Sequence, residues 1–220
     1  MVMNATWRAN PETPTLGCMS AYEPFAVWAP YPQDVRLRLG EDTLPMRRIS
    51  ADWWVADQIA EPGMRYGFEL HDGQNWAGPF PDPRTTSQPD GIHGLSEVTD
   101  PAYDWTSDNW TGRDLAGQVI YELHVGTFTP EGTFEGVIEK LGYLRDLGVT
   151  AIELMPVQPF GGDRNWGYDG VDWMAVHHTY GGPEGLKKLV DAAHNAGIGV
   201  ILDVVYNHFG PDGNYNGMFG

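Results

Sequence analysis

The sequence has little cysteine, little positive charge and no long apolar run. Cys18 is the only cysteine among 220 residues, so neither a disulfide within the chain nor a cysteine metal site is possible. No apolar run approaches the ~18 residues that a membrane-spanning helix needs. Residues 1–14 also lack the apolar core of a secretory signal. We therefore expect a cytoplasmic protein with no membrane partner.

The charge balance is strongly acidic. The formal net charge is −17, from 13 Lys and Arg against 30 Asp and Glu, and both halves of the chain share the excess. A nucleic-acid surface needs a basic patch, and the sequence shows none, so we expect no nucleic-acid partner. Nine Trp and ten Tyr could stack on sugar rings, but such residues also fill the cores of β-sandwiches.

The first half of the chain has the pattern of an antiparallel β protein. Short runs of alternating apolar and polar residues are separated by turns rich in Gly, Pro and Asp. The expected strands cover residues 25–28, 35–39, 53–56 and 65–70. We predict a β-sandwich domain over residues 1–112, whose last part, from about residue 78, is an irregular, proline-rich connection.

The second half, residues 113–220, alternates strand and helix patterns. Thr133 and Gly148 are placed to begin and end a helix whose apolar residues recur at helical spacing, and Pro183 begins another. The expected strands cover residues 119–125, 149–155 and 200–208. Strands joined by helices with short turns predict a parallel sheet.

The third expected strand carries polar residues at its end. Residues 200–208 (VILDVVYNH) place Asp203 inside an apolar run and Asn207 and His208 at its tip. The carboxyl ends of parallel strands are where α/β barrels place their chemistry. The alternative is a core strand in which a neighbouring loop satisfies Asp203. The other candidate segment is the long connection 156–182, since such loops collect functional residues.

Other short motifs favour structure over chemistry. His177 and His178 are adjacent on an extended segment and point to opposite sides, so we assign them to structure rather than to one metal ion. Residues 181–184 (GGPE) are typical of the start of a helix. The chain has no Walker or dinucleotide-binding pattern, and we predict neither a cofactor nor a metal.

Four segments together resemble the α-amylase superfamily of (β/α)-barrel glycosidases. They are YELHVGTF (121–128), ELMPV (153–157), WGYD (166–169) and DVVYNH (203–208). The resemblance implies a multidomain β plus α/β protein. An immunoglobulin-like antiparallel β-sandwich would precede the first three strands and two helices of a (β/α)8 TIM barrel, which the chain would contain only in truncated form.

Within this superfamily the sequence resembles most the maltooligosyltrehalose trehalohydrolases. The segments GTFTPEGTF (126–134), WGYDGV (166–171) and NHFGPDGNY (207–215) carry this likeness. It implies cleavage of the α-1,4-glucosidic bond next to the trehalose end of a maltooligosyl chain, with retention of configuration. A debranching or branching enzyme is one alternative. A non-catalytic carbohydrate-binding module formed by residues 15–112 is another.

The resemblance assigns the substrate, a maltooligosaccharide or α-glucan, to particular residues. Tyr168 would be the aromatic platform under a sugar, and His208 would donate to its hydroxyl groups. Asp203 would hold the geometry of the site, in the family by pairing with an Arg on the fourth strand. The alternatives are an aromatic residue packed within its loop for Tyr168 and a histidine bonded to backbone for His208.

Three further residues belong to the expected substrate site. Trp166 and Asp169 flank Tyr168 in its loop, where Asp169 would brace the loop or be a solvated turn residue. Asn207 braces its loop or binds a structural calcium in many relatives, and we expect no metal here.

The two carboxyl groups that glycoside hydrolysis needs are not expected in this chain. In the superfamily they follow strands four and five, which we place beyond Gly220, so we expect this piece alone to be inactive. The roughly 250 residues of a complete barrel contain eight strand–helix units, and residues 113–220 fit three strands and two helices. The open edge of the third strand would be prone to aggregation. The oligomeric state is left open.

Overall fold

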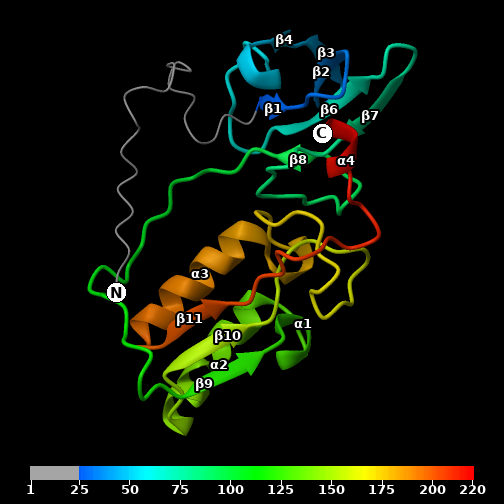
Figure 1. Cartoon of the computed structure of the whole chain (residues 1–220). Helices are drawn as coiled ribbons and strands as arrows, with labels where there is room; N and C mark the ends of the chain where they lie inside the picture. The colour runs from blue at the N-terminus through cyan, green and yellow to red at the C-terminus, as the bar shows by residue number, and fades with distance from the viewer. Residues whose placement is uncertain (1–24) are drawn as a thin grey trace.

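The computed structural model describes residues 25–220, which form an antiparallel β region and a parallel α/β region (Figure 1). Cys18 and the start of the predicted sandwich domain lie outside the described residues. Among the described residues, no helix combines the length and apolar character needed to cross a membrane.

The first region contains two antiparallel sheets. One has the strand order β1-β5-β4, and the other has the order β3-β2-β6-β7, with β8 paired to β6. The strands are β1 (Ala26–Trp28), β2 (Asp34–Leu39), β3 (Asp42–Pro45), β4 (Arg47–Arg48), β5 (Trp53–Val55), β6 (Arg65–His71), β7 (Trp76–Phe80) and β8 (Ser96–Glu97), with a short 3-10 helix at Ser50–Asp52. All four strands predicted in this region are therefore present, within a residue or two.

Alternation along the strands builds the first core. Val35 and Leu37 of β2 are fully buried, whereas Arg36 between them points outward, as the period of two in a strand requires. Both sheets contribute to one apolar cluster, in which Trp54 also donates from its indole nitrogen to the Ala29 carbonyl at 3.0 Å. The cluster includes Phe219, from the far end of the described chain.

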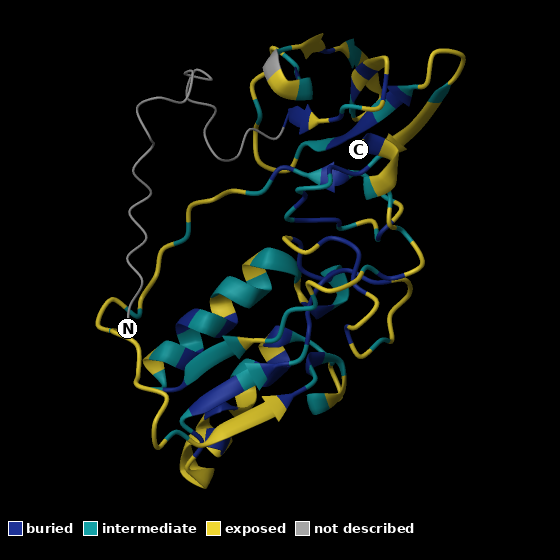
Figure 2. Cartoon of the chain, viewed as in Figure 1, coloured by how far each residue is buried: buried dark blue, intermediate teal, exposed yellow. Residues whose placement is uncertain are grey.

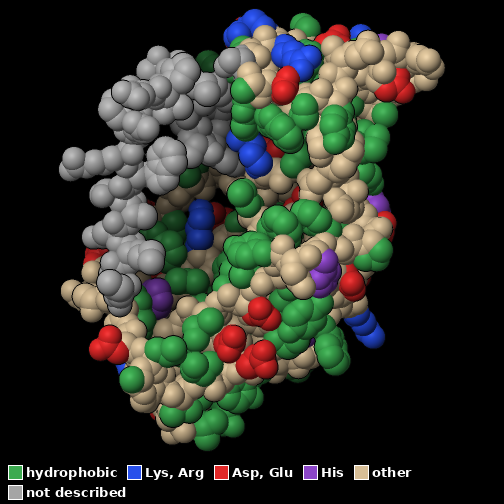
Figure 3. All heavy atoms as spheres, viewed as in Figure 1, with side chains coloured by type: hydrophobic (Ala, Val, Ile, Leu, Met, Phe, Trp, Pro, Cys, Tyr) green, Lys and Arg blue, Asp and Glu red, His purple; other side chains and the backbone are tan. Residues whose placement is uncertain are grey.

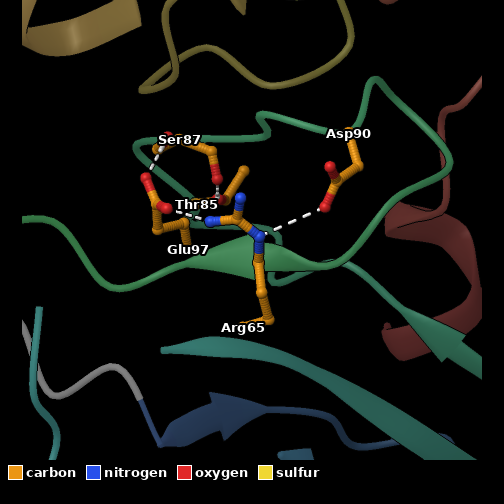
Figure 4. Close-up of polar contacts among 5 residues, drawn as sticks. All are labelled: Arg65, Thr85, Ser87, Asp90 and Glu97. Atoms are coloured by element: carbon orange, nitrogen blue, oxygen red, sulfur yellow. Dashed lines mark hydrogen bonds and ion pairs between the residues drawn. The ribbon is translucent and has the colours of Figure 1, made fainter. Parts of the chain in front are cut away.

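The connection after β7 is largely irregular, as predicted, and ion pairs hold it on the sheet (Figure 4). Arg65 of β6 pairs with Glu97, and its Nε atom lies 3.1 Å from Asp90 Oδ2. The Ser87 hydroxyl donates to Glu97 at 3.2 Å. The same segment touches the second region, since Ser87 forms an isolated parallel bridge with Val176.

The second region is a parallel sheet of order β11-β10-β9 with helices on one face. In chain order its elements are β9 (Ile120–Leu123), α1 (Val125–Phe128), α2 (Phe134–Leu147), β10 (Ala151–Leu154), a 3-10 turn (His178–Tyr180), α3 (Gly182–Asn195), β11 (Gly199–Leu202) and α4 (Asn216–Phe219). The expected helix signals act as predicted. Thr133 accepts from the Gly136 amide at 3.2 Å, and Gly148 ends α2 with φ +93°.

The face that the helices cover is apolar. Leu123, Ile152 and Leu154 of the sheet share one buried cluster with side chains of α2 and α3. Figure 2 shows that the central strand β10 is mostly buried, whereas the edge strand β9 is mostly exposed. Because successive strand residues alternate, Glu122 of β9 and Glu153 of β10 point to the opposite face.

The third strand is shorter than predicted. It ends at Leu202, so Asp203 follows the strand and is half-buried rather than enclosed within it. The neighbouring strand β10 ends at Leu154, just before Pro156, and the Asp203 amide makes the last bond, to the Leu154 carbonyl at 3.0 Å. Within residues 25–220, the residues beyond this point have no strand to pair with. The first strand likewise ends at Leu123, where α1 soon begins.

Candidate functional site

The carboxyl ends of β9, β10 and β11 form a rim that carries polar and aromatic side chains. The connection after β10 contributes the Tyr168 loop, defined here as residues 165–170. The connection after β11 contributes residues 203–219, which we call the strap. Sequence reasoning placed its candidate residues on these two connections, and the structure brings the connections into contact.

Tyr168 and Asp203 meet at this rim. The Tyr168 hydroxyl donates to Asp203 Oδ2 at 3.3 Å. Partial burial, and then the negative charge of Asp203, raises the pKa of the Tyr168 hydroxyl above its usual value. The hydroxyl therefore remains a donor at neutral pH, while 39% of the residue stays exposed and the ring is open to a ligand.

His208 lies beside the same loop, with a polar atom close to each ring nitrogen. Nε2 lies 2.8 Å from the Tyr168 carbonyl oxygen, so this nitrogen carries the proton that it donates. Nδ1 lies 3.0 Å from Oδ1 of Asn207, and both side chains are exposed. The backbone bond is the alternative that the sequence left open for His208. It also fixes the distance between the imidazole and the Tyr168 loop.

A tight backbone turn holds the Tyr168 loop in place. Gly167 has φ +95°, and a Cβ atom there would lie 2.2 Å from the Pro156 carbonyl oxygen, so no other residue fits. Asn165 accepts from the Gly167 amide at 2.8 Å and donates to Asp169 at 2.6 Å. Asp169 thus contacts its own loop. Trp166, 73% exposed, projects from the loop into solvent.

The structure adds His124, which the sequence analysis did not select. It follows β9 directly, and its Nε2 atom lies 2.7 Å from the Asn165 carbonyl oxygen and 3.2 Å from the Tyr180 hydroxyl. The carboxyl ends of parallel strands are where α/β barrels place their chemistry, and this rule selected the end of the third strand. Applied to the end of the first strand, the same rule would have found His124. All three strand ends therefore contribute to the rim.

Glu122 and Glu153 add negative charge next to the rim. The two residues are register partners in β9 and β10, and both raise the pKa of Tyr168 through their charge. Acidic side chains gather over the parallel sheet in Figure 3. An acidic site of this kind disfavours anionic ligands and suits neutral polar ones such as sugars.

The expectation that His177 and His178 point to opposite sides is wrong, because their ring centroids lie 4.9 Å apart. His177 is 1% exposed and stacks on Phe160 with ring centroids 3.9 Å apart. Burial lowers the pKa of His177 to about 4, so it is neutral at physiological pH. Within residues 25–220, no group of three or more His, Cys, Asp or Glu side chains is arranged to hold a metal ion.

Comparison with known proteins gives a consistent result. Residues 72–217 match the family model described as the catalytic domain of alpha amylase. A malto-oligosyltrehalose trehalohydrolase from Arthrobacter ramosus is 52% identical over 202 residues, covering 89% of this chain and 34% of that protein. The chain thus spans about a third of the length of the curated relatives that it matches.

Solved structures agree in fold. A crystal structure of a Salmonella typhimurium protein, provisionally described as an alpha amylase, matches with a TM-score of 0.83 and 46% identity over 89% of this chain and 33% of that one. The pullulanase of Anoxybacillus sp. LM18-11, solved with maltotetraose, matches with a TM-score of 0.68 and 29% identity, covering 86% of this chain and 34% of that one.

Proposed function

Because this chain belongs to the α-amylase family, we propose that it is part of a glycoside hydrolase that releases trehalose from maltooligosyltrehalose. The 52% identity to a curated trehalohydrolase over most of the chain supports this substrate. The enzyme would hydrolyse the α-1,4-glucosidic bond next to the trehalose end, by a retaining mechanism with two carboxyl groups. Since the chain spans about a third of such relatives, it would supply part of the substrate site.

The contact between Tyr168, Asp203 and His208 is the observation that carries this proposal. The exposed Tyr168 ring would lie under one sugar unit, with its hydroxyl held by Asp203. His208 keeps its bond to the Tyr168 carbonyl, and a sugar hydroxyl would replace Asn207 as the partner of Nδ1. Trp166 would border the same sugar chain, and Asp169 would keep the loop in place through Asn165.

The proposed fold of the whole enzyme follows from the same membership. The two antiparallel sheets would form an immunoglobulin-like sandwich, and the three parallel strands would be the first part of a (β/α)8 barrel. We assign no bond-breaking role to the described residues. Their part in the reaction would be to bind the glucan and to position it.

A debranching activity is the nearest alternative. The pullulanase shares the fold, but its identity of 29% is well below the 52% shared with the trehalohydrolase. A carbohydrate-binding module made by the first region alone is an alternative of another class. It differs from the proposal in a measurable way, because its glucan affinity would not depend on Tyr168.

The test is calorimetric titration of maltotetraose into the chain and two variants. We expect Tyr168→Ala to weaken binding about tenfold, since an aromatic contact contributes roughly 1 kcal/mol or more. Tyr143→Ala is the matched control, because Tyr143 is an exposed tyrosine on α2, outside the rim. Equal affinity of Tyr168→Ala and the wild type would overturn the rim as the sugar site and favour the binding-module alternative.

A further inference from the structure

The strap connects the rim to the first region of the molecule. Its first half is fixed on the rim: His208 bonds the Tyr168 carbonyl, and the Gly210 amide donates to the Gly170 carbonyl at 2.9 Å. Its last half runs to the antiparallel sheets and ends in α4, beside β6 and β7 (Figure 1). Phe219 is 2% exposed there and packs edge-on against Phe68.

One residue of the connection after β7, His93, contacts two residues in the last half of the strap. His93 Nδ1 lies 2.6 Å from the Tyr215 hydroxyl, and His93 Nε2 lies 3.3 Å from Asp212 Oδ1. Both contacts are satisfied when the tyrosine hydroxyl donates to Nδ1 and Nε2–H donates to the carboxylate. The His93 imidazole therefore bridges two strap residues.

Steric contact supports this bridge. A Cβ atom on Gly213, which has φ +78°, would lie 2.6 Å from Cδ1 of Ile92, the residue before His93. The Tyr215 ring packs on Phe80 of β7 with centroids 5.0 Å apart. The strap is thus held against the first region from Asp212 to Tyr215.

We propose that His93 and Tyr215 are positioning residues for the rim, because they hold the strap that carries Asp203 and His208. Only Pro211 separates Asp212 from Gly210, and consecutive Cα atoms are about 3.8 Å apart, so a shift at Asp212 is transmitted to the Gly210–Gly170 bond. The inference rests on the proposed function for what the rim binds. The mechanical link itself is independent of the ligand.

The experiment compares residue-resolved hydrogen exchange and maltotetraose binding in the same variants. His93→Phe keeps a planar ring but removes both polar contacts. We expect it to speed exchange of the Gly210 amide about tenfold, as the loss of roughly one to two hydrogen bonds implies. Amides of β2 serve as the internal reference. The ring ¹⁵N shifts of His208 should change, and the affinity for maltotetraose should fall several-fold.

Three further variants make the result specific. Tyr215→Phe removes one hydroxyl, keeps the packing on Phe80, and tests the bridge even if His93→Phe does not fold. His93→Gln retains an amide that can donate and accept, so it should restore part of the protection at Gly210. Tyr143→Phe, at an exposed site on α2, should change neither readout.

The two proposals fail in different ways. Unchanged Gly210 exchange in both His93→Phe and Tyr215→Phe overturns the positioning role, whatever the glucan data show. Faster exchange in a chain whose wild type does not bind maltotetraose supports the mechanical link and overturns the rim as a glucan site. Faster exchange with weaker binding supports both.

Discussion

The antiparallel and parallel regions use their surfaces differently. In the first region, arginines on the sheets lie over aromatic rings or pair with acids, as Arg36 does over Trp76 at 3.8 Å and Arg65 does with Glu97. In the second region, exposed aromatic side chains such as Trp166, Tyr168 and Tyr206 lie on the connections that follow the strands. The comparison indicates which exposed side chains are available to contact a ligand. The first region pairs its sheet arginines with its own rings and acids, and the second exposes aromatic side chains on the connections that follow its strands.

The largest expected effect tests whether a residue from the second half of the sequence stabilises the core of the first region. Phe219 lies in the second half of the sequence but in the core of the first region. We expect Phe219→Ala to lower the free energy of unfolding by about 3–5 kcal/mol, because a buried phenylalanine leaves a cavity. Denaturant unfolding measures this change. Met218→Ala, at an exposed neighbour on the same helix, should cost less than about 0.5 kcal/mol.

The next prediction concerns a carboxyl group buried near the junction of the two regions. Asp172 in the second region is 5% exposed, and its Oδ2 atom has no hydrogen-bond partner among the described residues. Burial, and then the charge of Asp82 in the first region, raises the pKa of Asp172 to about 8. Between the ordinary pKa near 4 and about 8, the unfolded chain is ionised while the folded chain keeps its proton. Stability therefore falls as pH rises through this window and is flat above it.

Asp172→Asn removes this dependence. Unfolding measured from pH 4 to 8 should show the wild type losing up to about 1.4 kcal/mol per pH unit relative to the variant. At pH 7 the variant should be the more stable protein. Asp146→Asn, at an exposed aspartate on α2, should leave the slope unchanged. Parallel pH profiles for the wild type and Asp172→Asn would show that Asp172 is ionised in the folded chain.

A smaller effect sharpens the comparison within the second region. Thr133 caps α2 through the Gly136 amide, so Thr133→Ala should cost about 1 kcal/mol of stability. Thr133→Ser keeps the hydroxyl and should cost less. Thermal unfolding of the three proteins measures the difference, and equal losses for alanine and serine would mean that the cap contributes nothing.

The smallest effect concerns the acidic charge beside the rim. Glu153 raises the pKa of Tyr168, so Glu153→Gln should lower it toward the usual value for tyrosine. Titration of the Tyr168 ring carbon by NMR follows this pKa directly. Glu139→Gln on α2 is the control. If this variant changes the pKa of Tyr168 by the same amount as Glu153→Gln, the effect comes from net charge and not from the position of Glu153.

Much of the fold was predictable because the local signals agree with the tertiary contacts. Thr133 and Gly148 bound α2 through bonds within a few residues, so the helix could be placed from the sequence. The third strand was predicted too long because its length depends on β10. Because β10 ends before Pro156, β11 loses its partner there. The residues of β11 alone could not predict this end.

The candidate site was predictable to the level of its two connections. The motifs identified Tyr168, Asp203 and His208, and family membership is confirmed by the match over residues 72–217. The partners of His208 could not be predicted, since they depend on the path of the Tyr168 loop around Gly167. His93 and Tyr215, 122 residues apart, meet only because the strap returns to the first region.

The sequence by itself determined the order of strands and helices, the caps of α2, and the two connections that carry polar side chains. These features follow from backbone propensities, apolar periodicity and short-range hydrogen bonds. The tertiary structure alone decided where β11 stops, that Nε2 of His208 bonds the Tyr168 carbonyl, and that the strap is held by the first region. Each of these depends on atoms far apart in the chain, whose meeting is set by packing rather than by local preference.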